Sequence, residues 1–293
     1  MPETKVNATN ARLHHRGRAL IGWMDPVQAV RALGGQRADV QASDDLRRRV
    51  AVAQDRVAQR TPPELAAAES VVRRVPTELL PYIERLKARP AAKPYFQEGW
   101  TVGLADLRYV LAFQPQTVVE GGEQRIPARG ASLLQLATVT IPAETESVVL
   151  SPSIDATKNV WSLSSDNPNL RIVGQFAGSE GGPPGATALG FFVAQLPSFM
   201  QVARVNDRWF LRDGYHRAIA LLQAGITLVP TLVRVFPTAE QLIPAGALPV
   251  SILLGPRPPL LSDYWDDQVA SAVEIPASRK AILIQGLEVG LIN

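Results

Sequence analysis

The sequence contains no cysteine among its 293 residues. Disulfide bonds, zinc sites built from thiolates and cysteine nucleophiles are therefore excluded. A chain without disulfides suits a reducing compartment, and we expect the protein to be cytoplasmic.

Long apolar runs are also lacking. No stretch approaches about 18 uninterrupted apolar residues, the length that a membrane-spanning helix needs. The first residues, MPETKVNATNARLHHRGRAL, have no apolar segment after a basic start. We therefore expect neither a secretory signal nor a contact with the membrane.

Charge is modest overall but unevenly distributed. The net charge is +3, while residues 1–60 carry Lys5 and ten arginines against six acids. A basic region of this kind favours anionic partners, and nucleic acid is a possible one. Arginine-rich helices that simply face solvent are the common alternative. The hydrophobic share of 46% and the charged share of 19% are typical of a globular protein with a buried core.

The pattern of residues predicts an α+β fold in two parts: a helical, basic region over 1–90 and a mixed-sheet domain over 91–293 with a proline-rich C-terminal extension. We expect residues 1–22 to be loosely packed. Three segments of the first part have helical spacing or helix-start signals such as Ser43 and adjacent Thr and Pro. They are SDDLRRRVAVAQDRVAQR, TPPELAAAESVVRRV and PTELLPYIERLKARP.

The second part is less regular. We predict a strand leading into a short helix in GWTVGLADLRYVLAF, and strands in the β-branched segment RGASLLQLATVTIPAETESVVLSPS. VWSLSSDNPNLRIVGQF is predicted to be a loop followed by a strand. Near the end, DDQVASAV is predicted to be a short helix, and KAILIQGLEVGLI one or two strands.

The clearest pattern lies between residues 200 and 236. MQVARV and RWFLRD are predicted strands, and Asn206-Asp207 between them is a turn signal. A helix is predicted over about 215–224, ending at Gly225 in the position that tolerates left-handed geometry. TLVPTLVRVF follows as another strand, so the predicted unit is a hairpin, a helix and a strand.

The sequence Asp-Gly-Tyr-His-Arg stands where this hairpin meets the helix. The first turn of a helix has backbone N–H groups without intrahelical partners, and the helix dipole attracts anions there. Gly214 lets a ligand approach the backbone, Arg217 can offer two hydrogen bonds to a phosphate, and His216 can exchange a proton near neutral pH. Asp213 can cap the helix, orient His216 or hold a metal ion. Ordinary helix capping, with His216 and Arg217 facing solvent, explains the same residues.

With its hairpin, alanine-rich helix and Val-Pro strand, the segment resembles the ParB/sulfiredoxin-like superfamily, specifically members with an Asp-Gly-x-His-Arg signature. The resemblance covers about residues 190–236. It implies a phosphate-binding turn formed by Asp213, Gly214, Tyr215, His216 and Arg217. It also implies a nucleotide or nucleic acid as the partner, with a nucleoside triphosphate and Mg²⁺ as the expected cofactors.

Departures from the superfamily patterns narrow the choice of activity. Tyr215 stands where the reductase branch needs a cysteine, so that chemistry is excluded. No helix-turn-helix DNA reader is predicted after Phe236, which argues against chromosome partitioning. A kinase would need an acidic base and a magnesium site, and Asp155, Asp166 and Glu180 are available for them but lie in no recognisable motif.

Three functions remain open. The first is a nucleotide- or phosphate-binding protein that hydrolyses or transfers phosphate, with Asp213 and His216 as the catalytic residues. The second is a DNA- or RNA-associated factor, nuclease-like in character, that binds backbone phosphate. The third is a non-catalytic structural or interaction protein, so the sequence does not decide whether the protein is an enzyme.

Other candidate sites have simpler explanations, and we predict no metal site in the protein itself. The acids of SDYWDDQ have no recognised metal-binding spacing, and the adjacent pair His14 and His15 cannot face one site on a helix. The glycine-rich segment AGSEGGPPGA lacks the spacing of a phosphate-binding Walker loop. Trp100, Tyr109 and Phe113 could stack on bases, but core packing is the expected role of these aromatics.

Overall fold

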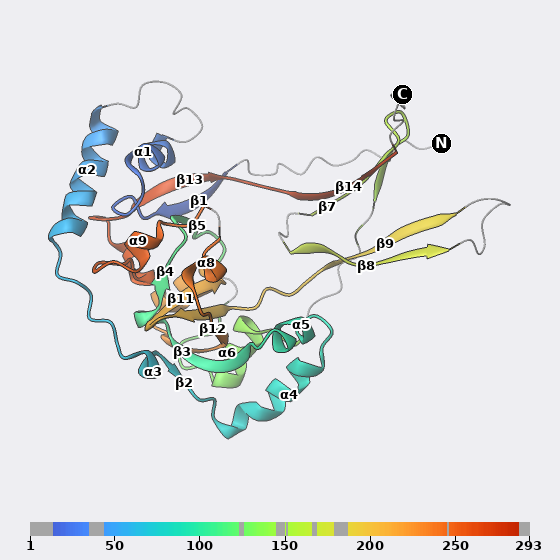
Figure 1. The fold of residues 1–293 in the computed structure, drawn as a ribbon, viewed down its shortest axis with the longest axis horizontal. Helices are drawn as coiled ribbons and strands as arrows, with labels where there is room; N and C mark the ends of the chain where they lie inside the picture. The colour runs from blue at the N-terminus through green and yellow to red at the C-terminus, as the bar shows by residue number, and fades with distance from the viewer. Residues whose placement is uncertain are drawn as a thin grey trace. The chain divides into compact units, whose positions relative to one another are not determined.

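The computed structural model shows an α+β protein, with 33% helix, 32% strand and sheets of mixed direction, as predicted. It describes residues 14–34, 44–122, 126–144, 150, 152–165, 169–178, 187–244 and 246–286. The chain divides into two compact units (Figure 1). Unit 1 comprises residues 1–143 and 199–277, and unit 2 comprises residues 144–198 and 278–293.

A six-stranded sheet forms the centre of unit 1. β10 and β11 are an antiparallel hairpin, β12 runs parallel to β10, and β3 is antiparallel to β12. The order across the sheet is β2-β3-β12-β10-β11-β4. The strands are β2 (Val72–Arg73), β3 (Thr101–Asp106), β4 (Leu111–Ala112), β10 (Gln201–Val205), β11 (Arg208–Asp213) and β12 (Leu228–Val235).

The predicted hairpin, helix and strand are confirmed in this sheet. Asn206 has a positive φ of 52° at the turn between β10 and β11, as its place in the turn signal suggests. Helix α7 (Tyr215–Gln223) connects β11 to β12, and Gly225 follows it with a φ of 73°. Side chains on both faces of β11, such as those of Phe210 and Leu211, are fully buried. This packing holds the junction between β11 and α7 in place.

A second sheet of unit 1 has the order β13-β1-β5. Its strands are β1 (His14–Ala19), β5 (Gln116–Val118) and β13 (Ser271–Pro276). The expectation of loose packing is wrong for residues 14–22, because Leu20 and Ile21 lie in the core. The predicted helix over 266–273 is also wrong. Ser271 and Val273 alternate with exposed residues in β13, and this period of two is that of a strand.

Two of the three predicted N-terminal helices are confirmed, as α2 (Asp44–Gln59) and α4 (Leu80–Ala88); the predicted cap Ser43 lies outside the described residues. The third prediction is wrong over most of its length, since only α3 (Ala68–Val71) is helical there. The adjacent prolines 62 and 63 disfavour helical geometry before them. Val72 then leaves the helix to pair with β3.

Helix α6 (Leu133–Thr140) lies where strands were predicted. Ser132 accepts a hydrogen bond from the backbone of Gln135, and the Gln135 side chain accepts one from the backbone of Ser132. This reciprocal capping outweighs the β-branched composition of the segment. The other α-helices among the described residues are α1 (Pro26–Gly34), α5 (Lys93–Gln97), α8 (Ala239–Leu242) and α9 (Val250–Leu253). None of the helices that the structure describes is long and apolar enough to cross a membrane.

The boundary predicted near residue 90 lies inside unit 1, where α4 and α5 lead directly into β3. Both the predicted strand and the short helix after it are present, as β3 and a 3-10 helix over Leu107–Tyr109.

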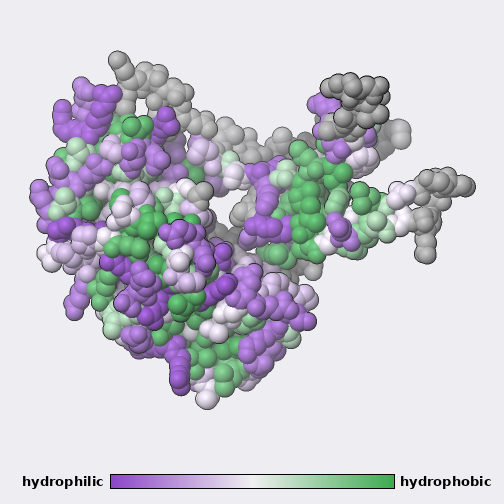
Figure 2. Space-filling model, viewed as in Figure 1, coloured by the Kyte–Doolittle hydropathy of each residue, from purple (hydrophilic) through white to green (hydrophobic). Residues whose placement is uncertain are grey.

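The described residues of unit 2 form two small sheets. One has the order β14-β7-β6, and the other is the ribbon of β8 and β9. Its strands are β6 (Ser153–Asp155), β7 (Val160–Ser165), β8 (Leu170–Gly178), β9 (Ala188–Gln195) and β14 (Lys280–Gln285). The loop predicted at residue 160 is thus wrong, because β7 begins there. Several large apolar side chains of these strands, including Leu189 and Phe192, are exposed, and hydrophobic residues are visible on this unit in Figure 2.

Replacing Leu211 by alanine tests the buried face of β11. We expect Leu211→Ala to lower the free energy of unfolding by about 3 kcal/mol, because it leaves a cavity in a fully packed core. Leu134→Ala is the matched control, since Leu134 is an exposed leucine of α6 and alanine favours helix. Urea unfolding followed by circular dichroism measures both. Equal losses in the two variants would contradict the assigned burial.

Candidate functional site

Gly214 forms the corner between β11 and α7. Its φ of 95° and ψ of 23° are left-handed, and it is the N-cap residue of α7. A Cβ atom at this position would lie 3.1 Å from Cα, Cβ and Cγ of Met200. Both the backbone angle and the close approach of Met200 therefore require glycine.

The amino end of α7 has no side-chain cap. Asp213, the expected capping residue, instead accepts a hydrogen bond from the amide of Gly214 with its Oδ1 atom at 2.6 Å. The first intrahelical bond runs from the amide of Ala218 to the carbonyl of Gly214 at 2.9 Å. The amides of the residues between them lie at the positive end of the helix.

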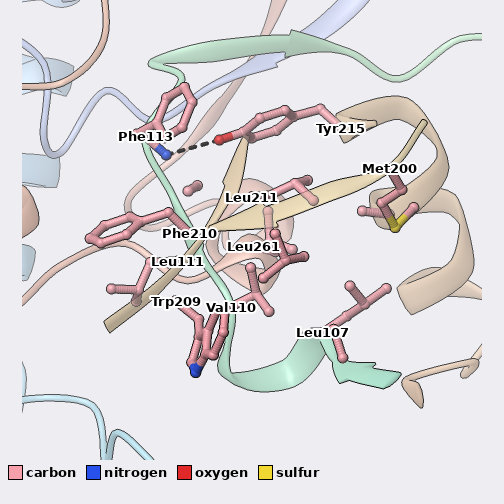
Figure 3. Close-up of a cluster of buried hydrophobic side chains, with 14 of the residues drawn as sticks. Leu107, Val110, Leu111, Phe113, Met200, Trp209, Phe210, Leu211, Tyr215 and Leu261 are labelled. Atoms are coloured by element: carbon pink, nitrogen blue, oxygen red, sulfur yellow. Dashed lines mark hydrogen bonds between the residues drawn. The ribbon is translucent and has the colours of Figure 1, made fainter. Parts of the chain in front are cut away.

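Tyr215 points into the core. Its hydroxyl accepts a hydrogen bond from the amide of Phe113 at 2.9 Å (Figure 3) and another from the amide of Gln114 at 3.3 Å. Its ring packs edge-on against Phe113 and Tyr264. Burial raises the pKa of Tyr215, and the two amide hydrogen bonds offset only part of this rise. The hydroxyl is therefore engaged within the protein, and Tyr215 positions the turn.

Arg217 is directed at the carboxyl end of α6. Its Nη1 atom donates to the carbonyl of Val139 at 2.8 Å and lies 3.5 Å from the carbonyl of Thr140. A cation at this end of a helix also interacts favourably with the helix dipole. Arg217 thus ties α7 to α6, a role that its place in the motif does not reveal.

His216 is the exposed residue of the first turn of α7. The neighbouring loop passes close behind it, since a Cβ atom on Gly122 would lie 2.9 Å from the carbonyl oxygen of His216. The backbone of this turn is thus packed while the imidazole faces outward. An imidazole at the positive end of a helix can contact an anion held there.

Asp213 lies in a polar cluster that the motif alone does not predict. Burial raises the pKa of Tyr95, and the negative charge of Asp213 raises it further. Because this second effect depends on distance, the side chains of Tyr95 and Asp213 lie near each other. Gln201 accepts a hydrogen bond from Nη1 of Arg212 at 3.1 Å, and Arg212 lies over the ring of Trp100 at 5.3 Å. Arg212 adjoins the motif in sequence and Gln201 pairs with Asp213 in the β10–β11 hairpin, whereas Tyr95 of α5 is brought to it only by the fold.

The other candidate residues have structural roles. Asp263 accepts two hydrogen bonds from Arg60, at 2.9 and 3.1 Å, and Asp267 accepts one from Arg18 at 2.6 Å. Asp266 accepts from the amide of Gln268 at 2.9 Å. Among the described residues, no group of three or more acids and histidines is placed to hold a metal ion.

The histidine pair and the aromatic set are also part of the fold. His14 and His15 are successive residues of β1, so their side chains point to opposite faces. Trp100 and Phe113 are buried in the core and Tyr109 packs against it. Asp155 accepts hydrogen bonds from Thr157 in a tight turn of unit 2. Asp166, Glu180 and most of the glycine-rich segment, 179–186, lie outside the described residues.

Comparisons with protein-family models, with curated proteins and with solved structures gave no match to this chain. The resemblance to ParB/sulfiredoxin-like domains therefore stays a prediction.

Replacing Gly214 by alanine tests the corner. The left-handed backbone alone costs an alanine roughly 1–2 kcal/mol. The contact with Met200 adds to this, so we expect Gly214→Ala to lose about 3 kcal/mol in total. Gly99→Ala separates the two effects, because Gly99 has a φ of 90° with no atom near its missing Cβ. If urea unfolding shows the same loss of stability in Gly99→Ala as in Gly214→Ala, the contact with Met200 does not contribute to the destabilisation of Gly214→Ala.

Removing the hydroxyl of Tyr215 tests its internal role. We expect Tyr215→Phe to lose about 1–3 kcal/mol, because two buried amides lose their acceptor. Because burial raises the pKa of Tyr215, the folded state favours the neutral phenol. The neutral phenol contributes its full share to the free energy of unfolding below pH about 10, and this contribution falls as the pH rises above that value. The loss of stability on raising the pH should therefore be smaller in Tyr215→Phe than in the wild type. Unfolding measured at neutral and alkaline pH gives both quantities, and identical pH profiles would contradict the buried position.

Proposed function

We propose that the protein binds a phosphate group at the turn between β11 and α7, and that a nucleoside triphosphate with Mg²⁺ supplies it. One observation carries the proposal: α7 begins at a left-handed glycine and has no side-chain cap. Its positive end is thus built from backbone amides, as in known phosphate-binding turns. The resemblance to ParB/sulfiredoxin-like domains supports the same ligand.

The side chains of the motif divide into two groups in this proposal. Asp213, Tyr215 and Arg217 hold the turn, since each makes a hydrogen bond within the protein. The amides of the first turn and the exposed His216 contact the phosphate. The motif implies that Tyr215 and Arg217 contact the phosphate directly. In this proposal, both residues position the turn instead.

The same arrangement limits how a reaction could proceed. His216 is the residue of the turn that could exchange a proton with a bound phosphate, because its side chain is exposed and an imidazole can both donate and accept a proton. Asp213 is directed at the amide of Gly214, so it stabilises the corner that the phosphate would approach. Hydrolysis or transfer of phosphate would therefore depend on His216 more directly than on Asp213.

Thermal unfolding with nucleotides tests the proposal. ATP, CTP and GTP, each with Mg²⁺, should be screened against the wild type, His216→Ala and the control His14→Ala. A ligand present at 100 times its Kd stabilises the folded state by about 2.7 kcal/mol. We expect at least one nucleotide to raise the Tm of the wild type and of His14→Ala, and to raise that of His216→Ala less.

Two results would contradict the proposal. The first is that no nucleotide raises the Tm of the wild type. The second is a rise of equal size in His216→Ala, which would place the ligand elsewhere. Because His216 is exposed, its replacement should leave the Tm without ligand nearly unchanged. The alternative function, nucleic-acid binding, is supported by a different part of the protein, the arginines of helix α2.

A further inference from the structure

A groove of about 450 Å³ runs between α2 and the turn that precedes β13. Arg48, Arg49 and Arg56 line it from the helix, and Asp267 lines it from the turn. All of these residues belong to unit 1. In Figure 2, hydrophilic residues cover the surface over this helix. A volume of this size lies within the range of known ligand sites.

The acids of the groove are already paired. Asp45 lies 3.5 Å from Arg48, and Asp267 lies 2.6 Å from Arg18. The pKa of Asp267 is lowered mainly by the hydrogen bond and the charge of Arg18, and Arg49 adds a smaller effect. Arg18 and Arg48 therefore compensate the negative charge of the acids in the groove. Arg49 contributes only a small part of this compensation, and Arg56 forms no ion pair with these acids.

Arg49 and Arg56 are the uncompensated charges of the groove. Both are exposed, and within the part of the chain that the structure describes neither forms an ion pair with an acid. They are seven residues apart, so they share one face of α2 at a separation of about 10 Å along the axis. Ile21 and Ala53 also line the groove and contribute only apolar side chains. Two exposed arginines thus line an open groove whose acids, Asp45 and Asp267, form their ion pairs with Arg48 and Arg18.

We propose that this groove binds a ligand with phosphate groups in a row, which Arg49 and Arg56 contact together. The guanidinium group matches phosphate through paired hydrogen bonds, and it remains charged at every physiological pH. The separation of the two arginines favours several linked phosphates over a single ion. A polynucleotide backbone and a free oligophosphate share this chemistry.

This site is independent of the turn between β11 and α7. The groove contains no residue of that turn, so each can be removed without the other. Loss of nucleotide binding in His216→Ala therefore says nothing about the groove, and loss of polyanion binding through α2 says nothing about the turn.

The test uses the full chain and two probes. A labelled single-stranded oligonucleotide is followed by fluorescence anisotropy over a range of salt concentrations, and tripolyphosphate is followed by calorimetry. The variant is Arg49→Gln with Arg56→Gln. The control, Arg74→Gln with Arg129→Gln, removes two exposed arginines that lie outside the groove. His216→Ala is included to separate the groove from the turn.

We expect the Arg49/Arg56 variant to bind at least one probe about tenfold more weakly, with the control unchanged for both probes and His216→Ala unchanged for the oligonucleotide. For the oligonucleotide, the slope of log K against log salt should also become shallower by roughly 1.4, as for two lost phosphate contacts to a single strand. If the variant binds the oligonucleotide more weakly, the ligand of the groove is a polynucleotide. If only its binding of tripolyphosphate is weaker, the ligand is an oligophosphate. Equal weakening in the control, or no binding of either probe by the wild type, would overturn the proposal.

Discussion

The hydroxyl of Tyr215 links the helix that begins the candidate site to the core of unit 1. By accepting hydrogen bonds from the amides of Phe113 and Gln114, it fixes the start of α7 against the segment after β4. The same segment is held from other directions, because Phe113 accepts a hydrogen bond from the amide of Leu248 and Gln114 accepts one from the hydroxyl of Tyr264. The geometry of the turn therefore depends on contacts deep in the core.

A second constraint acts on the other side of the turn. Met200 leaves no room for a side chain at position 214, and Arg217 joins α7 to the carboxyl end of α6. Met200 and α6 are themselves connected, since the amide of Met200 donates to the carbonyl of Thr140 at 2.7 Å. Asp213, Tyr215 and Arg217 thus act mainly inward, and His216 is the exposed residue of the turn.

Local signals were sufficient to predict part of this structure. The hairpin, α7 and β12 follow from the turn signal at Asn206 and from the glycine after the helix, which act within a few residues. The prediction of strands over α6 is wrong because the mutual capping of Ser132 and Gln135, which is visible in the sequence, outweighs the β-branched composition. The prediction of a helix over β13 is wrong because this strand depends on its pairing partner, β1, which is more than two hundred residues away.

The candidate site was predictable in position but not in detail. The motif located the corner between strand and helix, and the structure adds that the glycine there is left-handed. The inward direction of Tyr215 and the engagement of Arg217 with α6 depend on segments far along the chain. Tyr95 comes near Asp213 only through the packing of α5, so no local pattern could name it, whereas Gln201 pairs with Asp213 in the predicted hairpin.

The most direct measurement of the central claim is an NMR titration of the full chain with pyrophosphate, followed through the backbone amide signals. Phosphate binding at the amino end of α7 predicts that the largest shifts occur at the amides of Tyr215, His216 and Arg217, and that they saturate together. If these amides stay unchanged while signals elsewhere shift, the turn between β11 and α7 is a structural corner and not a phosphate site.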